Sequence, residues 1–312
     1  MNTNTPRKWA VIYCPREGSF TANRRCSKIK QALLDAGINY DYVRSDAPGS
    51  VERLAGMMTE NGYQTIIIIG GDAALNDTIN GILKAKSPDG TLPALGIIPN
   101  GFGNDFAHYW GYDFNKYQEA IRHLAFRRTR LVDVGVADIV RNDDVRDRRY
   151  FLDCLNLGLV SSVIQLRRKT RRFWSIKGLS YLTSAFLLIF KRKLFNFHFT
   201  VNFEEIRHKE MTVCVGSSTG YGLTPSAVPY NGMLDVTAVG NSGIGGLLQG
   251  FWLLFTGRFL RHRHIKLWRT ENVKFHDTDG ATVCLDGRVY HHKVKQLEVN
   301  IEKEKIAFII PQ

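Results

Sequence analysis

The sequence predicts two domains, an α/β domain with a mainly parallel sheet over residues 1–130 and a β-rich sandwich over residues 131–312. In the first part, short apolar runs alternate with helical patterns, which is typical of βαβ units. These runs are continuously apolar, so we expect a sheet that is covered on both faces. After Arg130, short strand-like runs separated by turn residues predominate. The sequence leaves open whether the last few residues return to the first domain.

Local signals justify each element of the first domain. A helical pattern that starts near Ala22 stops at Gly37, a residue suited to end a helix. Ser50 is expected to cap the N-terminus of the next helix. The expected strands cover residues 9–13, 40–44, 65–69 and 95–98, and the expected helices cover residues 22–36, 51–61 and 75–83.

The second domain is predicted to contain short strands with two helical stretches among them. The helical stretches cover residues 174–190 and 244–260, and both are rich in aliphatic and aromatic side chains. The expected strands cover residues 131–139, 150–157, 197–203, 211–215, 234–239, 272–275 and 282–285.

Composition excludes several classes of protein. With 312 residues and 44% hydrophobic content, the chain can bury a sizeable core. The five cysteines are scattered and odd in number, so the sequence indicates neither a disulfide framework nor a zinc site. The N-terminus is polar, and no run reaches the about 18 apolar residues of a membrane span. We therefore expect a cytoplasmic protein.

The net charge of +13 is unevenly distributed, because basic clusters in the second half flank the two apolar helical stretches. Such a surface attracts nucleic acid, anionic membranes or anionic substrates. No nucleic-acid-binding module is recognisable, so we do not expect a nucleic-acid partner. Apolar helices with cationic ends fit peripheral binding to an anionic membrane surface. The other interpretation is that both helices simply pack on the sandwich.

Two glycine-rich turns follow successive expected strands. The first is Gly70-Gly71-Asp72, and the second runs over residues 99–107 and contains Gly101, Gly103, Asn104 and Asp105. Glycines between a strand and a helix let backbone N–H groups approach an anion closely. The pair of turns therefore suits a nucleotide polyphosphate with Mg²⁺. Tight turns also use glycine for steric reasons alone, and Asp72 could simply cap the helix that follows.

These turns resemble known motifs. Residues 70–77 resemble the G-G-D-G-T-x-N-E motif of lipid kinases and NAD kinases, and residues 99–107 resemble the P-x-G-T-G-N-D-F-A motif that is particular to lipid kinases. Further matching segments follow in the same order at residues 133–135, 151–158, 220–225, 231–235 and 285–287. Nearly the whole chain thus resembles the diacylglycerol kinase and sphingosine kinase group.

The resemblance implies an ATP- and Mg²⁺-dependent lipid kinase that phosphorylates the hydroxyl of a diacylglycerol-like or sphingoid-like lipid and associates peripherally with the membrane. It leaves a homodimer open. It implies that Asp286 is the general base, that Asp72 and Asp235 are metal ligands, and that Arg288 lies near the base or contacts phosphate. The implied nucleotide-binding residues are Cys14, Gly70, Gly71, Asp72, Ala73, Ala74, Asn76, Gly101, Phe102, Gly103, Asn104 and Asp105.

Other interpretations remain open. Asp286-Gly287 is also a hairpin turn signal, which would make Asp286 structural. Ala73 stands where the motif has glycine, and a Cβ there would cost about 1–2 kcal/mol if φ were positive. The motif is also changed at Cys14, Ala74, Phe102, Asn231 and Arg288.

These changes favour a second hypothesis, a catalytically weak or inactive homologue that binds lipid or membrane. A kinase of soluble substrates, such as NAD kinase, is disfavoured by Asn104-Asp105-Phe106-Ala107 and by the apolar helices.

Overall fold

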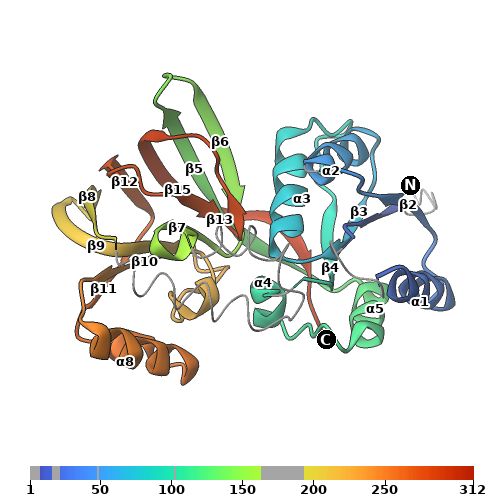
Figure 1. Cartoon of the computed structure of the whole chain (residues 1–312). Coiled ribbons are helices and arrows are strands. Elements are labelled where there is room, and N and C mark those ends of the chain that lie inside the picture. Colours follow the sequence, from blue (N-terminus) through green and yellow to red (C-terminus); the bar gives the residue numbers. More distant parts are fainter. Residues whose placement is uncertain (1–7, 16–21, 48, 102, 163–192) are drawn as a thin grey trace. The chain divides into compact units, whose positions relative to one another are not determined.

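A computed structural model describes residues 8–15, 22–47, 49–101, 103–162 and 193–312. The chain forms two compact units (Figure 1). Unit 1 comprises residues 1–132 together with 304–312, and unit 2 comprises residues 133–303.

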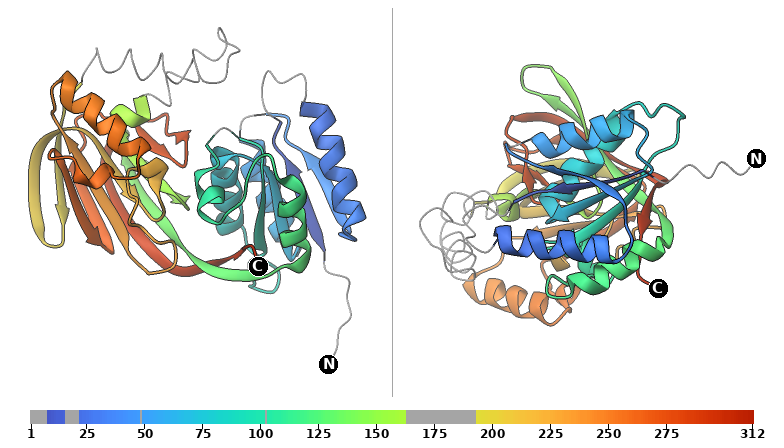
Figure 2. Two further views of the ribbon diagram at one scale, coloured as in Figure 1. Left: turned by 90° about the horizontal axis from the view of Figure 1, so that it is seen from below. Right: turned by 90° about the vertical axis from the view of Figure 1, so that its right-hand side faces the viewer.

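Unit 1 is built on a parallel sheet in the order β2-β1-β3-β4, with the end of β15 beside β4. Helices cover both faces, α2 and α3 on one and α1 and α5 on the other (Figure 2). The side chains of Ile66 to Ile69 are fully buried, which explains why this strand is continuously apolar. The elements are β1 (Trp9–Tyr13), α1 (Ala22–Asp35), β2 (Tyr40–Arg44), α2 (Ser50–Glu60), β3 (Thr65–Gly70), α3 (Asp72–Lys84), β4 (Ala94–Pro99), α4 (Asp105–Tyr109) and α5 (Tyr117–Phe126). Strand β15 (Val294–Ile309) begins in unit 2, and its residues from Glu304 onward belong to unit 1.

The α/β architecture of unit 1 confirms the predicted fold class, but three details differ. Helix α2 starts at Ser50, and the residue before it, Gly49, has a φ of 79°. The expectation that Ser50 caps this helix is therefore wrong, because its hydroxyl instead hydrogen-bonds the hydroxyl of Ser45. Helix α3 starts at Asp72, earlier than expected, and α5 was not predicted.

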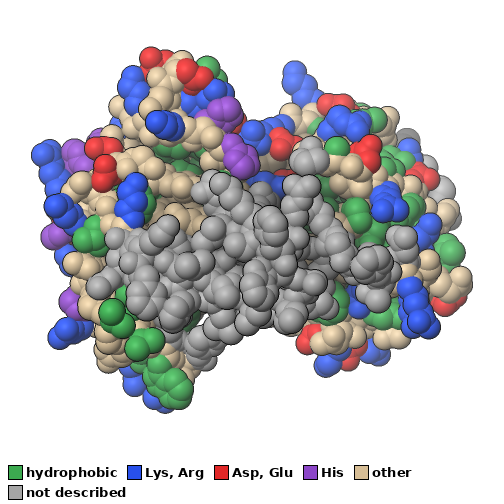
Figure 3. Space-filling model, viewed as in Figure 1, with side chains coloured by type: hydrophobic (Ala, Val, Ile, Leu, Met, Phe, Trp, Pro, Cys, Tyr) green, Lys and Arg blue, Asp and Glu red, His purple; other side chains and the backbone are tan. Residues whose placement is uncertain are grey.

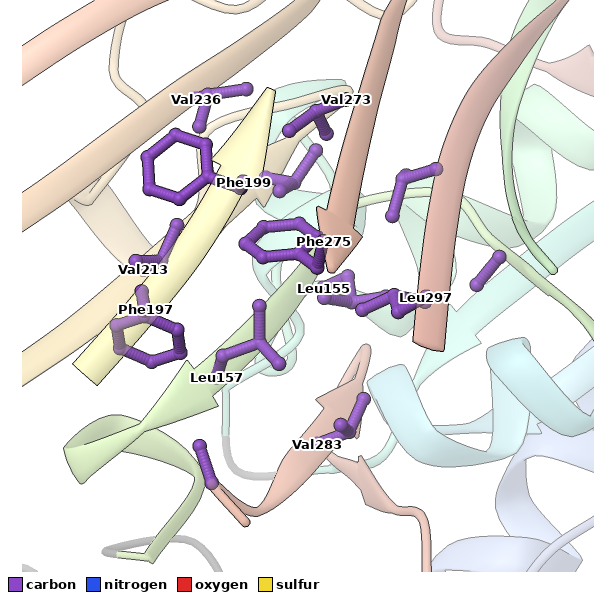
Figure 4. Close-up of a cluster of buried hydrophobic side chains, with 14 of the residues drawn as sticks. Leu155, Leu157, Phe197, Phe199, Val213, Val236, Val273, Phe275, Val283 and Leu297 are labelled. Atoms are coloured by element: carbon purple, nitrogen blue, oxygen red, sulfur yellow. The ribbon is translucent and has the colours of Figure 1, made fainter. Parts of the chain in front are cut away.

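Unit 2 is antiparallel, and β9 is its central strand. The first half of β9 pairs with β8, and the second half pairs with β7 and β10. Its core contains Phe197, Phe199, Phe275 and Leu297, all almost fully buried (Figure 4). The elements are β5 (Thr129–Arg141), β6 (Arg146–Phe151), β7 (Cys154–Gly158), β8 (Phe195–Val201), β9 (Glu204–Gly216), β10 (Leu234–Gly240), α8 (Ile244–Phe255), β11 (Ile265–Thr270), β12 (Asn272–Asp277), β13 (Val283–Leu285), β14 (Arg288–Val289) and two 3₁₀ turns (Gly220–Gly222 and Phe259–Arg261).

The structure divides two of the runs predicted in the second domain. The run 150–157 is two strands, β6 and β7, separated at Leu152 and Asp153. The run 244–260 is helix α8 followed by a 3₁₀ turn. The expected helix 174–190 lies outside the described residues. Within the described ranges, no helix is long and apolar enough to span a membrane.

Candidate functional site

The predicted nucleotide-binding residues gather at one edge of the unit 1 sheet. Strands β1, β3 and β4 are parallel neighbours, so their carboxyl ends meet there. Cys14, just after β1, donates its N–H to the carbonyl of Ile69 at 3.0 Å, and Asn100, just after β4, donates to the carbonyl of Gly70 at 2.6 Å. In doubly wound sheets this edge is where ligands bind.

Gly71 and Gly101 bring the two turns into direct backbone contact. A Cβ on Gly71 would lie 2.6 Å from the Cα of Gly101, so neither position can carry a side chain without displacing backbone. Asn104 closes the second turn, because its Oδ1 accepts the N–H of Gly101 at 2.9 Å. Asn104 has a φ of 53°, in the left-handed region that asparagine tolerates better than most residues. We call Gly70, Gly71, Gly101 and Asn104 the glycine cradle.

The first turn of α3 borders the glycine cradle. Asp72 is its first residue and is 7% exposed. Ala73 is a helical residue and is not among the described residues with positive φ, so the backbone strain considered for its Cβ is absent. Ala74 is buried, and a Cβ on Gly70 would lie 2.6 Å from the Cβ of Ala74, which explains the glycine at position 70.

The other residues predicted to contact the nucleotide differ in how far they are buried. Asn76 is buried within α3, where its backbone and side-chain oxygens accept the amide of Asn80. Asp105 is the first residue of α4 and is half-buried. Gly103 lies in the second glycine-rich turn and is half-buried, and Phe102 lies outside the described residues.

In unit 2, Asp286 occupies the turn of the β13–β14 hairpin. Asp286 and Gly287 have φ values of 44° and 77°, as a type I′ turn requires. The carboxylate is 2% exposed and accepts three backbone N–H groups, from Leu152 at 2.8 Å, Asp153 at 3.0 Å and Cys154 at 2.8 Å. We call this arrangement the Asp286 clamp. It joins the hairpin to the turn between β6 and β7 and stabilises the negative charge of the carboxylate.

Asp153 extends the clamp to a third segment. Its carboxylate is fully buried and accepts the N–H of Gly220 at 2.9 Å. Its carbonyl accepts the N–H groups of Ser217 at 2.9 Å and Ser218 at 3.0 Å. Burial raises the pKa of the neighbouring Cys154 thiol, and a bond with Cys214 and the Asp153 charge add to this. Full burial of this kind is typical of a cysteine that packs in a core.

Arg288 and Asp235 complete the predicted set. Arg288 begins β14 and faces Leu285 across the hairpin. Asp235, in β10, is 1% exposed and binds Arg269, its direct neighbour on β11. Thus the structure brings the unit 1 residues together at one sheet edge, whereas Asp286 and Asp235 belong to separate networks within unit 2.

Two family models match consecutive parts of the chain. The model described as "Diacylglycerol kinase catalytic domain" matches residues 8–137, and that described as "YegS C-terminal NAD kinase beta sandwich-like domain" matches residues 158–302. The chain belongs to the diacylglycerol kinase family of lipid kinases.

Curated relatives match the chain along most of their own length. The diacylglycerol kinase of Staphylococcus saprophyticus is 24% identical over 285 residues, covering 89% of this chain and 87% of its own. That of Bacillus subtilis is 21% identical, covering 89% and 88%. A crystal structure of a diacylglycerol kinase from Bacillus anthracis aligns with 97% of both chains at a TM-score of 0.68 and 17% identity, which shows the shared fold.

Three residues of these networks could not be singled out from the sequence. Asp153 lies within a segment that resembles the family, but no local pattern distinguishes it from its neighbours. Arg269 lies far in sequence from Asp235, and Ser226 lies in the turn before its strand; both contact the Asp235 carboxylate. Only the register of β10 with β11 reveals that Asp235 and Arg269 face each other.

Proposed function

We propose that this lipid kinase transfers the γ-phosphate of ATP to the hydroxyl of a diacylglycerol-like or sphingoid-like lipid. The glycine cradle is the observation that carries the proposal. It offers backbone groups without side chains at the edge of a parallel sheet, directly before the N-terminus of α3. This combination favours the phosphate groups of a nucleotide, because helix N-termini carry partial positive charge.

The carboxylates beside the glycine cradle suit a magnesium ion that is bound both by these carboxylates and by the nucleotide phosphates. Asp72 and Asp105 are the first residues of α3 and α4. Mg²⁺ in kinases is typically held by one or two carboxylates and the phosphates of the substrate. When bound, the ion would offset the negative charge of the transferring phosphoryl group.

In the proposed reaction, the lipid hydroxyl oxygen bonds to the γ-phosphorus, and the bond from that phosphorus to the bridging oxygen breaks, releasing ADP. The hydroxyl proton must pass to a base. Asp286 is our candidate base because of the family resemblance. The Asp286 clamp holds this carboxylate in a fixed position, as a base requires. The same three hydrogen bonds also give Asp286 a structural role in unit 2.

Calorimetric titration of the purified chain with Mg²⁺–ATP tests the nucleotide half of the proposal. We expect saturable binding that is weakened in Asp72→Ala. Transfer of radiolabel from γ-labelled ATP into lipid, with diacylglycerol and sphingoid bases assayed separately, tests the other half. Absence of binding at millimolar nucleotide would contradict the kinase proposal and favour the alternative of a lipid-binding homologue without activity.

We also propose that the lipid kinase reaches its substrate by binding to anionic membranes through α8. One stripe of this helix is exposed: Ile244 is 49%, Leu248 60% and Trp252 69% accessible. These residues are four positions apart and share one face. Hydrophobic side chains gather over α8 in Figure 3. On the opposite side, Leu254 packs near Gly222, and Leu247 is buried.

The charge around this exposed stripe fits an anionic lipid surface. Residues 236–270 contain no aspartate or glutamate. Arg258, Arg261, Arg263 and Lys266 follow α8 and are all exposed. A helix with an apolar stripe and nearby basic residues binds at the boundary between lipid headgroups and acyl chains.

A further inference from the structure

Asp235 is a buried carboxylate whose charge is neutralised from within the protein. It is 1% exposed and accepts Nε of Arg269 at 2.8 Å and Nη2 of Arg269 at 3.2 Å. The hydroxyl of Ser226 donates to Oδ2 of the same carboxylate. Both carboxylate oxygens therefore already have donors, and one positive charge balances one negative charge.

Arg269 is held in this position by its strand and by a second contact. It lies directly opposite Asp235 in the β10–β11 pair, so the strand register brings the two side chains together. Its Nη2 also donates to the backbone carbonyl of Ser226 at 2.9 Å. The side-chain bond and the charge of Asp235 raise the pKa of Arg269. The guanidinium of an arginine is always charged in proteins.

The side chains around Asp235 do not form a carboxylate cluster that would hold a divalent metal ion. The side chain of Asn231 is neutral, and its Oδ1 accepts the N–H of Met233 at 3.0 Å. Asp133, whose strand leads into unit 2, uses Oδ2 to accept the N–H of Gly232 at 2.6 Å. Across the described parts of the chain, no group of three or more His, Cys, Asp or Glu residues could hold a metal ion. These residues disagree with the expectation that Asp235 is a metal ligand, because hard cations need several oxygen ligands.

We propose that Arg269 is a built-in cation that takes the place of a divalent metal ion at Asp235. Unit 2 then keeps its structure with or without divalent ions, and a requirement for Mg²⁺ would arise only at the nucleotide. The Arg269 side chain is 47% exposed, whereas that of Asp235 is 1% exposed. A buried carboxylate that loses its single charged partner is left uncompensated, which is destabilising. Without this guanidinium, the protein should be stabilised by an added divalent cation, whereas the natural protein should not be.

Thermal unfolding of the full chain without nucleotide tests this proposal independently of kinase activity. The natural protein should have the same Tm in EDTA and in millimolar Mg²⁺ or Ca²⁺. Arg269→Ala should unfold several degrees lower in EDTA and regain part of that loss in Mg²⁺ or Ca²⁺. Asn231→Asp combined with Arg269→Ala should show a larger ion-dependent rise, because a second carboxylate is added.

Arg148→Ala is a matched control within unit 2. Arg148 also binds an aspartate through two nitrogens, at 2.6 Å and 3.0 Å, but its partner Asp138 is 36% exposed. Its removal should change Tm little and create no response to metal ions. Should Arg269→Ala fail to fold, Arg269→Lys, which keeps the charge, should fold and remain insensitive to metal ions.

Two results would overturn the proposal. One is a natural protein whose Tm rises by several degrees when Mg²⁺ or Ca²⁺ replaces EDTA. The other is an Arg269→Ala protein that is no less stable than Arg148→Ala. Neither result depends on whether the chain binds ATP, so failure of this proposal and failure of the kinase proposal are distinguishable.

Discussion

Gly71 and Gly101 come from different βα turns, yet their backbones are in contact. A Cβ on Gly101 would lie 2.4 Å from the Cα of Gly71 and 2.7 Å from Oδ1 of Asn104. Backbone atoms cannot move aside as the end of a flexible side chain can. The contact therefore fixes the spacing of the two turns that form the glycine cradle.

Gly101→Ala should separate these turns and weaken binding of Mg²⁺–ATP by at least about tenfold, as displaced cradle groups no longer match the phosphates. Calorimetric titration measures the loss. Gly56→Ala on α2 is the matched control, because its Cβ would meet its nearest atom, the carbonyl oxygen of Gly81, at 3.4 Å. Equal nucleotide affinity in the two variants would show that the glycine contact does not shape the site.

Asp286→Asn should lower the stability of unit 2 by about 1–3 kcal/mol, because an amide nitrogen cannot accept N–H groups that the carboxylate accepts. Denaturant unfolding measures this change. Asp279→Asn is the control: Asp279 accepts the backbone and side-chain N–H groups of Asn196, both at 3.0 Å, but is exposed. If Asp286→Asn proves as stable as this control and yet abolishes phosphate transfer, a catalytic role outweighs the clamp.

Ala73→Gly, which restores the glycine of the family motif, should destabilise unit 1 by about 0.5–1 kcal/mol. Ala73 is helical and unstrained, so glycine relieves nothing and adds backbone freedom to the unfolded chain. Unfolding curves of both proteins decide the point. An increase in stability would mean that the alanine Cβ is strained after all.

Glu210→Gln should remove a dependence of stability on pH. Burial raises the pKa of Glu210 above its ordinary value of 4.5, and the charge of Lys266 lowers it only in part. Because the folded-state pKa is the higher one, the stability contribution of Glu210 is complete below about pH 4 and is lost as pH rises through the folded pKa. A glutamine side chain cannot be charged, so the variant should match the natural protein at about pH 4 and be more stable at about pH 7.

The measurement is the Tm of both proteins across this range. Glu205→Gln is the control, because bonds with Arg207 and His198 lower the pKa of Glu205. Replacing Glu205 by glutamine should have the opposite effect, so that the natural protein has the higher Tm at neutral pH. If the Tm of Glu210→Gln changes with pH in the same way as the Tm of the natural protein, the raised pKa of Glu210 is refuted.

Trp252→Ser should weaken binding to vesicles of anionic phospholipid by about tenfold, since an exposed aromatic side chain would no longer be buried in lipid. Sedimentation with vesicles measures the bound fraction. Phe203→Ser is the control, because Phe203 is also an exposed aromatic residue but precedes Glu204 and Glu205 in its hairpin. Equal losses in both variants would argue against α8 as the membrane-binding surface.

Much of the fold could be predicted because periodicity and turn residues are local signals. The continuously apolar run at residues 65–69 predicts β3, and the structure places it fully buried in a parallel sheet. Strand β15 was not predicted, since exposed charged residues such as Lys303 and Glu304 interrupt its apolar residues. Helix α5, which follows soon after the second glycine-rich turn, was missed.

The candidate site was predictable where it consists of turn residues and not where it depends on strand pairing. Glycines 70, 71 and 101 were expected from motif resemblance, and the sheet brings them together. The Asp235–Arg269 pair depends on the register between β10 and β11, which no short-range pattern encodes. Catalytic and metal-binding roles of individual residues stay predictions until the variants are measured.

The return of residues 304–312 to unit 1 has a consequence for synthesis on the ribosome. Phe308 is fully buried and touches the rings of Phe106, Trp110 and Tyr112. Tyr112 also donates its hydroxyl to the carbonyl of Ile309 at 2.9 Å. N-terminal domains usually fold first as a chain emerges. Here the first unit translated must wait for the last residues, so it stays incomplete until after the whole of the second has been made.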